Sequence, residues 1–164
     1  VDPSMMVRSE PGDLFIVRNV ANLVPPCEHD QAYHGVSAAL EYAVCHLEVE
    51  HIIVLGHSNC GGIRSLMEGI PADKNGEYIS KWVSIAERAK QQVLENFSNA
   101  SPEHQAKACE HASILVSLEN LLTFPWVKER VDAGKLDLHG WYFEIESGNL
   151  YSYHPASGEF TLLV

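Results

Sequence analysis

The residues best suited to chemistry lie in one short segment, His57-Ser58-Asn59-Cys60, just after an apolar run at 52–55. An imidazole and a thiol three positions apart on one turn can reach the same tetrahedral metal ion, and zinc binds both ligand types readily. The apolar run is rich in β-branched side chains, which predicts a strand buried on both faces. Gly56 ends the run, and Gly61-Gly62 opens a helix. In open α/β sheets, ligands bind at this position, past the carboxyl end of a strand.

The residues alone leave three interpretations of this segment open. In the first, His57 and Cys60 are two ligands of a zinc ion. In the second, Ser58 is the nucleophile of a G-x-S-x-G elbow of the α/β-hydrolase type, although Cys60 stands where that motif needs a glycine. In the third, a buried cysteine and a hydrogen-bonded histidine simply cap a helix. The rest of the sequence has to decide among them.

Length and composition are those of one globular domain, and we expect residues 1–164 to form it. The chain is 46% hydrophobic and 20% charged, as in ordinary folded proteins. Its formal charge of −11 argues against a nucleic-acid partner or an anionic membrane surface, because both need a basic patch. No apolar run is long enough to span a bilayer. Four dispersed cysteines without a C-x-x-C motif favour free thiols, a reducing compartment and hence a cytoplasmic location.

Hydrophobic periodicity predicts an α/β domain with a β-rich C-terminal part. In chain order we expect a turn at 1–4 leading into a short helix, a turn at 11–13, a strand at 14–17, a helix at 31–47, a strand at 52–55, a short helix at 63–67, a polar loop at 71–76, helices at 81–94 and 102–122, a helical turn at 127–131, a strand at 136–145, a hairpin turn at 147–149, and strands at 150–153 and 160–163. The first strand, helix and second strand would form a βαβ unit, which favours a right-handed crossover and a parallel sheet.

With these elements in place, the sequence resembles the β-class carbonic anhydrases, in their plant-type and bacterial plant-like branch. The resemblance covers essentially the whole chain and is carried by PGDLFIVRNVANLVPP at 11–26, AALEYAV at 38–44, IIVLGHSNCGGI at 52–63, and LHGWYF at 138–143 with Ser147-Gly148. It implies the fold of that family, an α/β fold with a mainly parallel β-sheet flanked by helices and a C-terminal antiparallel edge strand.

The resemblance also implies a zinc lyase that reversibly hydrates carbon dioxide to bicarbonate and a proton, with one zinc ion per subunit. In the family two cysteines and one histidine hold the metal, and His57 and Cys60 match two of these ligands. The third ligand, a cysteine, belongs to a Cys-x-Asp-x-Arg motif that we expect immediately before Val1. The same motif supplies the catalytic Asp-Arg pair, so the resemblance assigns no such residue within 1–164.

Two alternatives remain open: a protein that lacks the third ligand and binds no zinc, and an enzyme with the same metal site but another substrate. Spacing places Cys45 and Cys109 in helices as packing residues, whereas Cys27 has the freedom of a loop but occupies a position that the family does not use. A relative without zinc would instead be a binding or assembly module. Close relatives with the same metal site hydrolyse carbon disulfide or carbonyl sulfide, and the sequence is compatible with these substrates too.

By resemblance, Phe15, Val20 and Tyr42 line an apolar pocket for carbon dioxide, and the backbone around Gly61 closes it. The same residues taken without the resemblance would be read as core positions on a strand and a helix.

Proton export needs a relay or a buffer, for which His29, His34 and His139 are candidates by residue type alone. The family further implies a homodimer, or a tetramer or octamer built from dimers. The C-terminal strand ending at 159–164 offers an edge that could pair between subunits.

Overall fold

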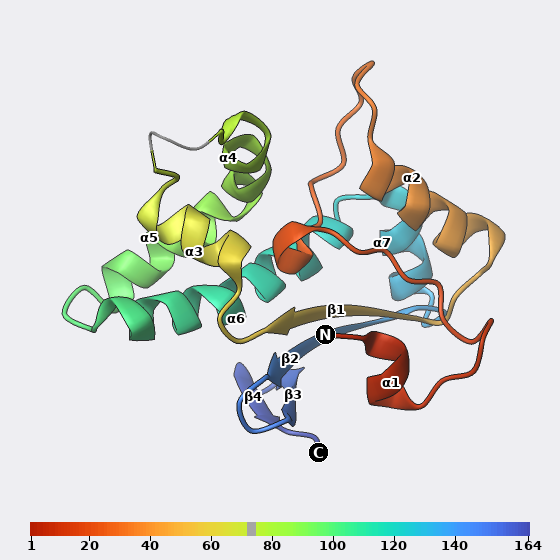
Figure 1. The fold of residues 1–164 in the computed structure, drawn as a ribbon. Helices are drawn as coiled ribbons and strands as arrows, with labels where there is room; N and C mark the ends of the chain where they lie inside the picture. Colours follow the sequence, from red (N-terminus) through yellow and green to blue (C-terminus); the bar gives the residue numbers. More distant parts are fainter. Residues whose placement is uncertain (72–74) are drawn as a thin grey trace.

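The computed structural model describes residues 1–71 and 75–164. Helices in these residues surround a four-stranded sheet (Figure 1). The α-helices are α1 (Pro3–Val7), α2 (Gly35–Glu41), α3 (Gly61–Glu68), α4 (Glu77–Val83), α5 (Glu87–Asn96), α6 (Pro102–Leu121) and α7 (Pro125–Asp132). Short helical turns are η1 (Val20–Asn22) and η3 (Ser84–Ala86), both 3-10, and the π-helical η2 (Tyr42–His46). The strands are β1 (His51–His57), β2 (Asp137–Glu144), β3 (Asn149–His154) and β4 (Glu159–Leu162).

The strands follow one another in the order β1-β2-β3-β4 across the sheet. β1 and β2 are parallel, with His57 opposite Phe143, whereas β2–β3 and β3–β4 are antiparallel hairpins. The predicted α/β fold is therefore confirmed, as are the expected strands and hairpin turn in the C-terminal part. The antiparallel part of the described sheet comprises two strands rather than one.

The long helix α6 positions the parallel pair of strands because glycines allow it to approach them closely. A Cβ atom on Gly56 of β1 would lie 2.7 Å from Ile114 Cδ1, and one on Gly140 of β2 would lie 2.9 Å from Ile114 Cγ2. Ile114 of α6 is fully buried against both strands and belongs to a core cluster with Val54 and Tyr142. Figure 1 shows α6 on one side of β1 and the short α1 on the other. The C-terminal end of β1 is therefore held from the α6 side.

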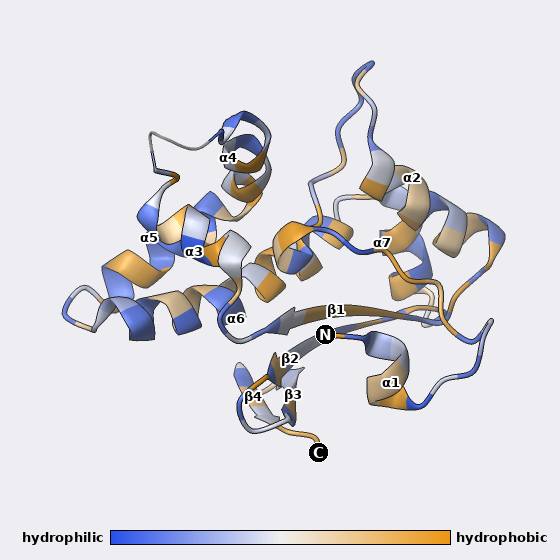
Figure 2. Ribbon diagram, in the orientation of Figure 1, coloured by the Kyte–Doolittle hydropathy of each residue, from blue (hydrophilic) through white to orange (hydrophobic). Residues whose placement is uncertain are grey.

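The strand predicted at 14–17 is absent, and that prediction was wrong. These four apolar residues form an extended segment without a ladder partner in the described chain, and all four side chains are exposed. The run is visible as a hydrophobic stretch before η1 in Figure 2. A strand needs a hydrogen-bonded neighbour, which apolar character alone does not supply. The predicted βαβ unit was consequently also wrong, because β1 takes its parallel partner from β2, beyond α3–α7.

Two predicted helices have different bounds because polar side chains bind the backbone locally. The helix expected at 31–47 begins only at Gly35, since the Asp30 carboxylate accepts the Ala32 N–H and the His34 imidazole lies against it. The helix expected at 81–94 is split into α4, η3 and α5, and the Ser84 hydroxyl donates to the Lys81 carbonyl at the break.

The remaining helices were predicted with small shifts. α6 matches its prediction to within one residue, and the short helices expected after 1–4, at 63–67 and at 127–131 correspond to α1, α3 and α7. Of the polar loop expected at 71–76, residues 72–74 lie outside the described part of the chain. Within the described residues, no helix is both long and apolar enough to cross a membrane.

Candidate metal centre

The site is built on the turn between β1 and α3. Pairing with β2 continues one residue past β1, because the Ser58 N–H donates to the Phe143 carbonyl at 3.0 Å. Asn59 then adopts a left-handed conformation with φ +55°, which asparagine tolerates better than most residues. Cys60 follows in an extended conformation as the N-cap of α3. This sharp reversal places His57 and Cys60 on the same end of the sheet.

The His57 ring is oriented by the backbone of the next residue, Ser58. Its Nδ1 donates to the Ser58 carbonyl at 2.8 Å, which leaves Nε2 as the nitrogen available to an incoming ligand. The adjacent Cys60 side chain raises the pKa of His57, and the Ser58 carbonyl adds to this against the opposing effect of burial. The imidazole and the thiol are therefore electrostatically coupled neighbours. A hydrogen bond that fixes one ring nitrogen while freeing the other is usual for a metal-binding histidine.

Cys60 is the most buried member of the segment, with 5% of its surface exposed. Burial by itself raises the pKa of a thiol, but His57 and the N–H groups of Ile63 and Gly62 outweigh it, so the pKa of Cys60 lies below its ordinary value. These N–H groups belong to the first turn of α3, where free donors favour an anion. The site thus makes the thiolate, which is the form that binds metals, easier to form than in a free cysteine.

Ser58 and Asn59 hold the turn in place rather than forming a nucleophile. The Ser58 hydroxyl donates to the Glu146 carboxylate at 2.8 Å and accepts the Ile145 N–H at 2.9 Å. The Asn59 side-chain amide also donates to Glu146. A serine nucleophile needs an adjacent base such as imidazole, and here the hydroxyl is engaged by a carboxylate and a backbone N–H. The hydrolase interpretation is not supported by this geometry.

A second carboxylate, Glu110 of α6, lies beneath the turn and was not identified from the sequence. It is buried, its Oε1 accepts the Cys60 N–H at 2.8 Å, and its Oε2 accepts the Tyr142 hydroxyl at 2.8 Å. Burial, and then the bond to Glu110, raise the pKa of Tyr142 above its ordinary value. Glu110 and Glu146 lie 50 and 88 positions from the residues they contact at the turn. The only local signal was a carboxylate on an otherwise apolar stretch of a helix.

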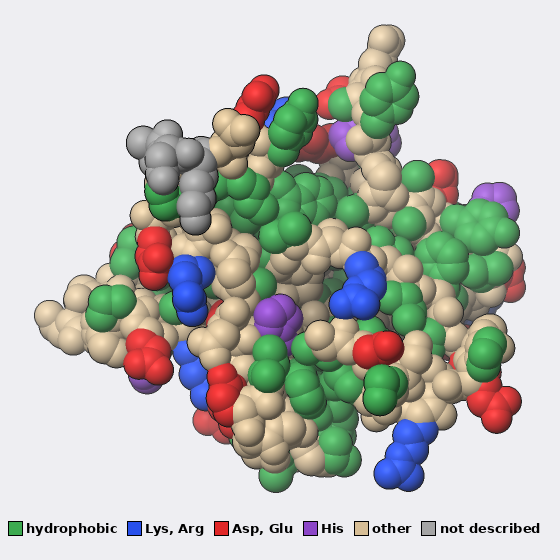
Figure 3. Space-filling view, viewed as in Figure 1, with side chains coloured by type: hydrophobic (Ala, Val, Ile, Leu, Met, Phe, Trp, Pro, Cys, Tyr) green, Lys and Arg blue, Asp and Glu red, His purple; other side chains and the backbone are tan. Residues whose placement is uncertain are grey.

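The predicted pocket residues divide into two pairs. Val20 of η1 packs against the start of α3, because a Cβ atom on Gly62 would come within 2.7 Å of Val20 Cγ1. Gly61, the first residue of α3, has open space around it. Phe15 and Tyr42 contact each other, with ring centroids 6.0 Å apart. Phe15, Val20 and Tyr42 are 46%, 48% and 51% exposed, so in this chain they form a surface rather than an enclosed pocket. Figure 3 shows hydrophobic side chains gathered in exposed groups on one face of the molecule.

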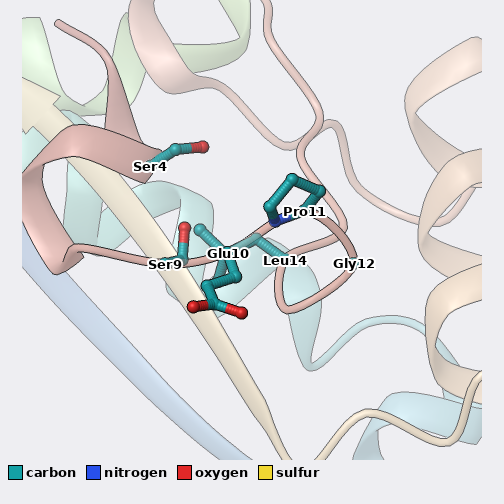
Figure 4. A pocket seen from close by; sticks show the side chains of 6 residues that line it. All are labelled: Ser4, Ser9, Glu10, Pro11, Gly12 and Leu14. Atoms are coloured by element: carbon teal, nitrogen blue, oxygen red, sulfur yellow. The ribbon is translucent and has the colours of Figure 1, made fainter.

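Two hollows elsewhere contain none of the predicted site residues. One, of about 220 Å³, lies beside α1 and is lined by Ser4, Ser9, Glu10, Pro11, Gly12 and Leu14 (Figure 4). The other, of about 420 Å³, lies between α6, α7 and the strands β2 and β3. Neither includes His57 or Cys60.

The three histidines considered as proton relays lie in different surroundings. His29 is beside Cys27, with 3.7 Å between Nε2 and Sγ, and His34 pairs with Asp30. His139 is hydrogen-bonded to His51 at 3.2 Å and lies opposite Ile53, four residues before His57 on β1. At about 3.3 Å per residue, His139 is roughly 13 Å along the sheet from the metal-binding end. Within the described part of the chain, His139 therefore lies away from the end of β1 that carries His57.

The other cysteines are not positioned as replacement ligands. Cys109 is packed in the same core cluster as Cys60, and burial raises its pKa to about 12, which keeps the thiol protonated at neutral pH. Cys45 is exposed on η2, and Cys27 lies beside His29. Within 1–71 and 75–164, no three His, Cys, Asp or Glu side chains are grouped so that they could hold a metal ion. The described residues thus offer two candidate ligands, His57 and Cys60, and a tetrahedral zinc site would need further donors.

Comparison with known proteins identifies the class to which this fold and turn belong. A family profile described as carbonic anhydrase matches residues 1–150. Beta carbonic anhydrase 5, chloroplastic, of Arabidopsis thaliana is 46% identical over 143 residues, which are 87% of this chain and 47% of that protein. A carbonic anhydrase of Synechocystis is 36% identical over 160 residues, which are 98% of this chain and 58% of that protein. The chain therefore belongs to the carbonic anhydrase family.

Solved structures place it within the β-class. The β-carbonic anhydrase CcaA superposes with a TM-score of 0.92 at 35% identity, covering 100% of this chain and 73% of that one. A β-carbonic anhydrase from Sordaria macrospora shares the fold at 24% identity, with a TM-score of 0.79, covering 98% of this chain and 76% of the other. The predicted family resemblance is thereby confirmed. The chain spans about half the length of the curated relatives it matches.

Proposed function

We propose that the protein catalyses the reversible hydration of carbon dioxide to bicarbonate and a proton, as a zinc-dependent lyase. The observation that carries this proposal is the coupled pair of His57 and Cys60, with Nδ1 of the histidine bound to a carbonyl and the pKa of the thiol lowered at the start of α3. Imidazole and thiolate are ligand types suited to zinc, and the bond to Nδ1 leaves Nε2 available for the metal. Membership of the carbonic anhydrase family supports the reaction.

His57 Nε2 and Cys60 Sγ would hold one zinc ion, together with the cysteine predicted before Val1. Zinc, when bound, acts as a Lewis acid that activates water at neutral pH. The chain's own residues keep the ligands in place: the Ser58 carbonyl fixes the imidazole, and Glu146 fixes the turn through Ser58. In the described sheet β1 is an edge strand, and its free edge could pair with a strand leading into the predicted motif.

Phe15, Val20 and Tyr42 would bind the apolar substrate once their exposed surface is covered. Exposed apolar residues at 14–17 and at Val20 support a homo-oligomer in which a second subunit covers this surface. β4 is the other edge of the described sheet and supports pairing of strands between subunits. A dimer, or a larger assembly of dimers, is the state we propose. A monomer in light scattering would contradict it.

The proposed function is tested by measuring zinc content and substrate preference together. The full-length protein should contain one zinc ion per subunit and hydrate carbon dioxide far faster than it hydrolyses carbon disulfide or carbonyl sulfide. Preferential turnover of either sulfur compound would support the metal site but show that carbon dioxide is not the main substrate. Protein that remains free of metal after incubation with zinc would instead indicate a binding or assembly module.

A further inference from the structure

The side chain of Glu110 is buried, and burying a carboxylate costs folding free energy. Glu110 lies on α6, and none of the ion pairs formed by the described residues includes it. Charged residues are rarely buried without a partner, and replacing them with apolar side chains of similar size is often neutral or stabilising. Stability alone therefore does not account for a carboxylate at this position.

Both oxygens of Glu110 are used, and they connect three elements at the metal-binding turn. Oε1 accepts the Cys60 N–H and Oε2 accepts the Tyr142 hydroxyl, each at 2.8 Å. Tyr142 lies on β2 directly opposite Gly56, the residue before His57. The carboxylate therefore ties α6 both to the strand beside His57 and to the backbone of Cys60.

The hydrogen bond from the Cys60 N–H to Glu110 lies where the backbone of the turn reverses direction. The preceding Asn59 has a positive φ, and Cys60 itself is extended, so the backbone reverses direction between β1 and α3. Holding the Cys60 N–H fixes the plane of the 59–60 peptide, and with it the direction of the Cα–Cβ bond that carries the sulfur. Without Glu110 this buried N–H would lose its partner, and the turn would have to move to find another.

We infer that Glu110 is a positioning residue for Cys60, whose carboxylate holds the backbone so that the thiolate and the His57 imidazole converge on one metal ion. This inference rests on the proposed zinc site. It assigns Glu110 an effect on metal affinity that an ordinary buried residue of α6 would not have.

The test compares three single variants of the full-length protein by competition for zinc against a chromophoric chelator. Glu110→Leu keeps the volume of the side chain and removes the acceptor, whereas Glu110→Gln keeps one acceptor oxygen within reach of Cys60. Ser113→Ala is the structural control, because this buried hydroxyl of α6 donates to the Glu110 carbonyl and not to the turn. We expect about 10- to 100-fold weaker zinc binding for Glu110→Leu, the scale for residues that support metal ligands. The zinc affinity of Glu110→Gln should stay closer to that of wild type, and the zinc affinity of Ser113→Ala should equal that of wild type.

A second measurement does not depend on the metal. In the zinc-free protein, the amide proton of Cys60 should resonate downfield in ¹⁵N-resolved NMR spectra, as expected for a bond to a carboxylate, and should shift upfield in Glu110→Leu. Equal zinc affinity in Glu110→Leu and Ser113→Ala, or an unchanged Cys60 amide resonance, would overturn the inference. If wild-type protein bound no zinc while the Cys60 resonance still responded to Glu110, the proposed function would fail and the backbone contact would stand.

Discussion

His111 gives the protein a built-in sensitivity to acid. Its ring is half-buried on α6, with centroids 4.2 Å from Tyr142 and 4.5 Å from Phe160, and its buried Nε2 has no hydrogen-bond partner among the described residues. Burial, and to a smaller extent the nearby Lys107, lower the pKa of His111 to about 4, while Glu144 opposes the shift. The neutral imidazole fits this environment, and the protonated form does not.

The size of the effect follows from linkage. The folded pKa of about 4 lies below the unfolded value of 6.5, so the unfolded state binds the proton more tightly between these values. Stability is therefore fully present above pH 6.5 and falls as the pH falls toward 4. The loss is about 2 kcal/mol between pH 7 and pH 5, and about 3 kcal/mol by pH 4. Such a change is a large part of the stability of an ordinary domain.

Urea denaturation from pH 7 to pH 5 at constant ionic strength measures this contribution. His111→Phe keeps an aromatic ring against Tyr142 and Phe160 without a titrating nitrogen, and His111→Leu covers the case in which the larger ring does not fit. Either variant should lose about 2 kcal/mol less than wild type over this range. His104→Gln is the matched control, because His104 is exposed near the start of the same helix. The reasoning is refuted if the His111 variants and His104→Gln show the same pH dependence as wild type.

Two further predictions concern the turn and the helix that follows it. Gly62→Ala should lower the free energy of unfolding by about 1–3 kcal/mol, because the new methyl group would meet Val20 Cγ1 at 2.7 Å, whereas Gly61→Ala, with open space around it, should be nearly neutral. Equal denaturation midpoints for the two variants would contradict this packing. Ser58→Ala should cost about 1–3 kcal/mol by leaving the Ile145 N–H without its acceptor and removing one of the donors to Glu146, yet retain carbon dioxide hydration. Complete loss of activity in folded Ser58→Ala protein would instead favour the interpretation in which Ser58 is a nucleophile.

The parts of the fold that were predictable are those fixed by local pattern. The β-branched run at 52–55 predicted β1, and the alternation beyond 136 predicted β2 with its hairpins. β1 nevertheless continues through Gly56, the expected strand end, to His57, and it is buried at alternate positions rather than on both faces. The run at 14–17 has the same apolar character but pairs with no strand in residues 1–71 and 75–164, so its apolar pattern alone wrongly predicted a strand. Pairing between strands is a long-range property. In the same way, the parallel partner of β1 lies more than 80 positions along the chain.

The candidate site shows the same division. His57 and Cys60 could be proposed as ligands from the sequence because they are three residues apart on one turn, and this spacing suits a metal. Glu110 and Glu146 were not, because each reaches the turn from a distant element and only the fold brings them there. The supporting groups of a site are set by tertiary structure, whereas its ligands can be local.

The most direct test of the central claim is stopped-flow hydration of carbon dioxide by the full-length protein, with zinc content measured on the same samples, for wild type and Cys60→Ser. The account predicts fast hydration by wild type with one zinc ion per subunit, and the loss of both in Cys60→Ser. Hydration that survives in Cys60→Ser, or wild-type protein that is inactive although it contains zinc, would contradict it.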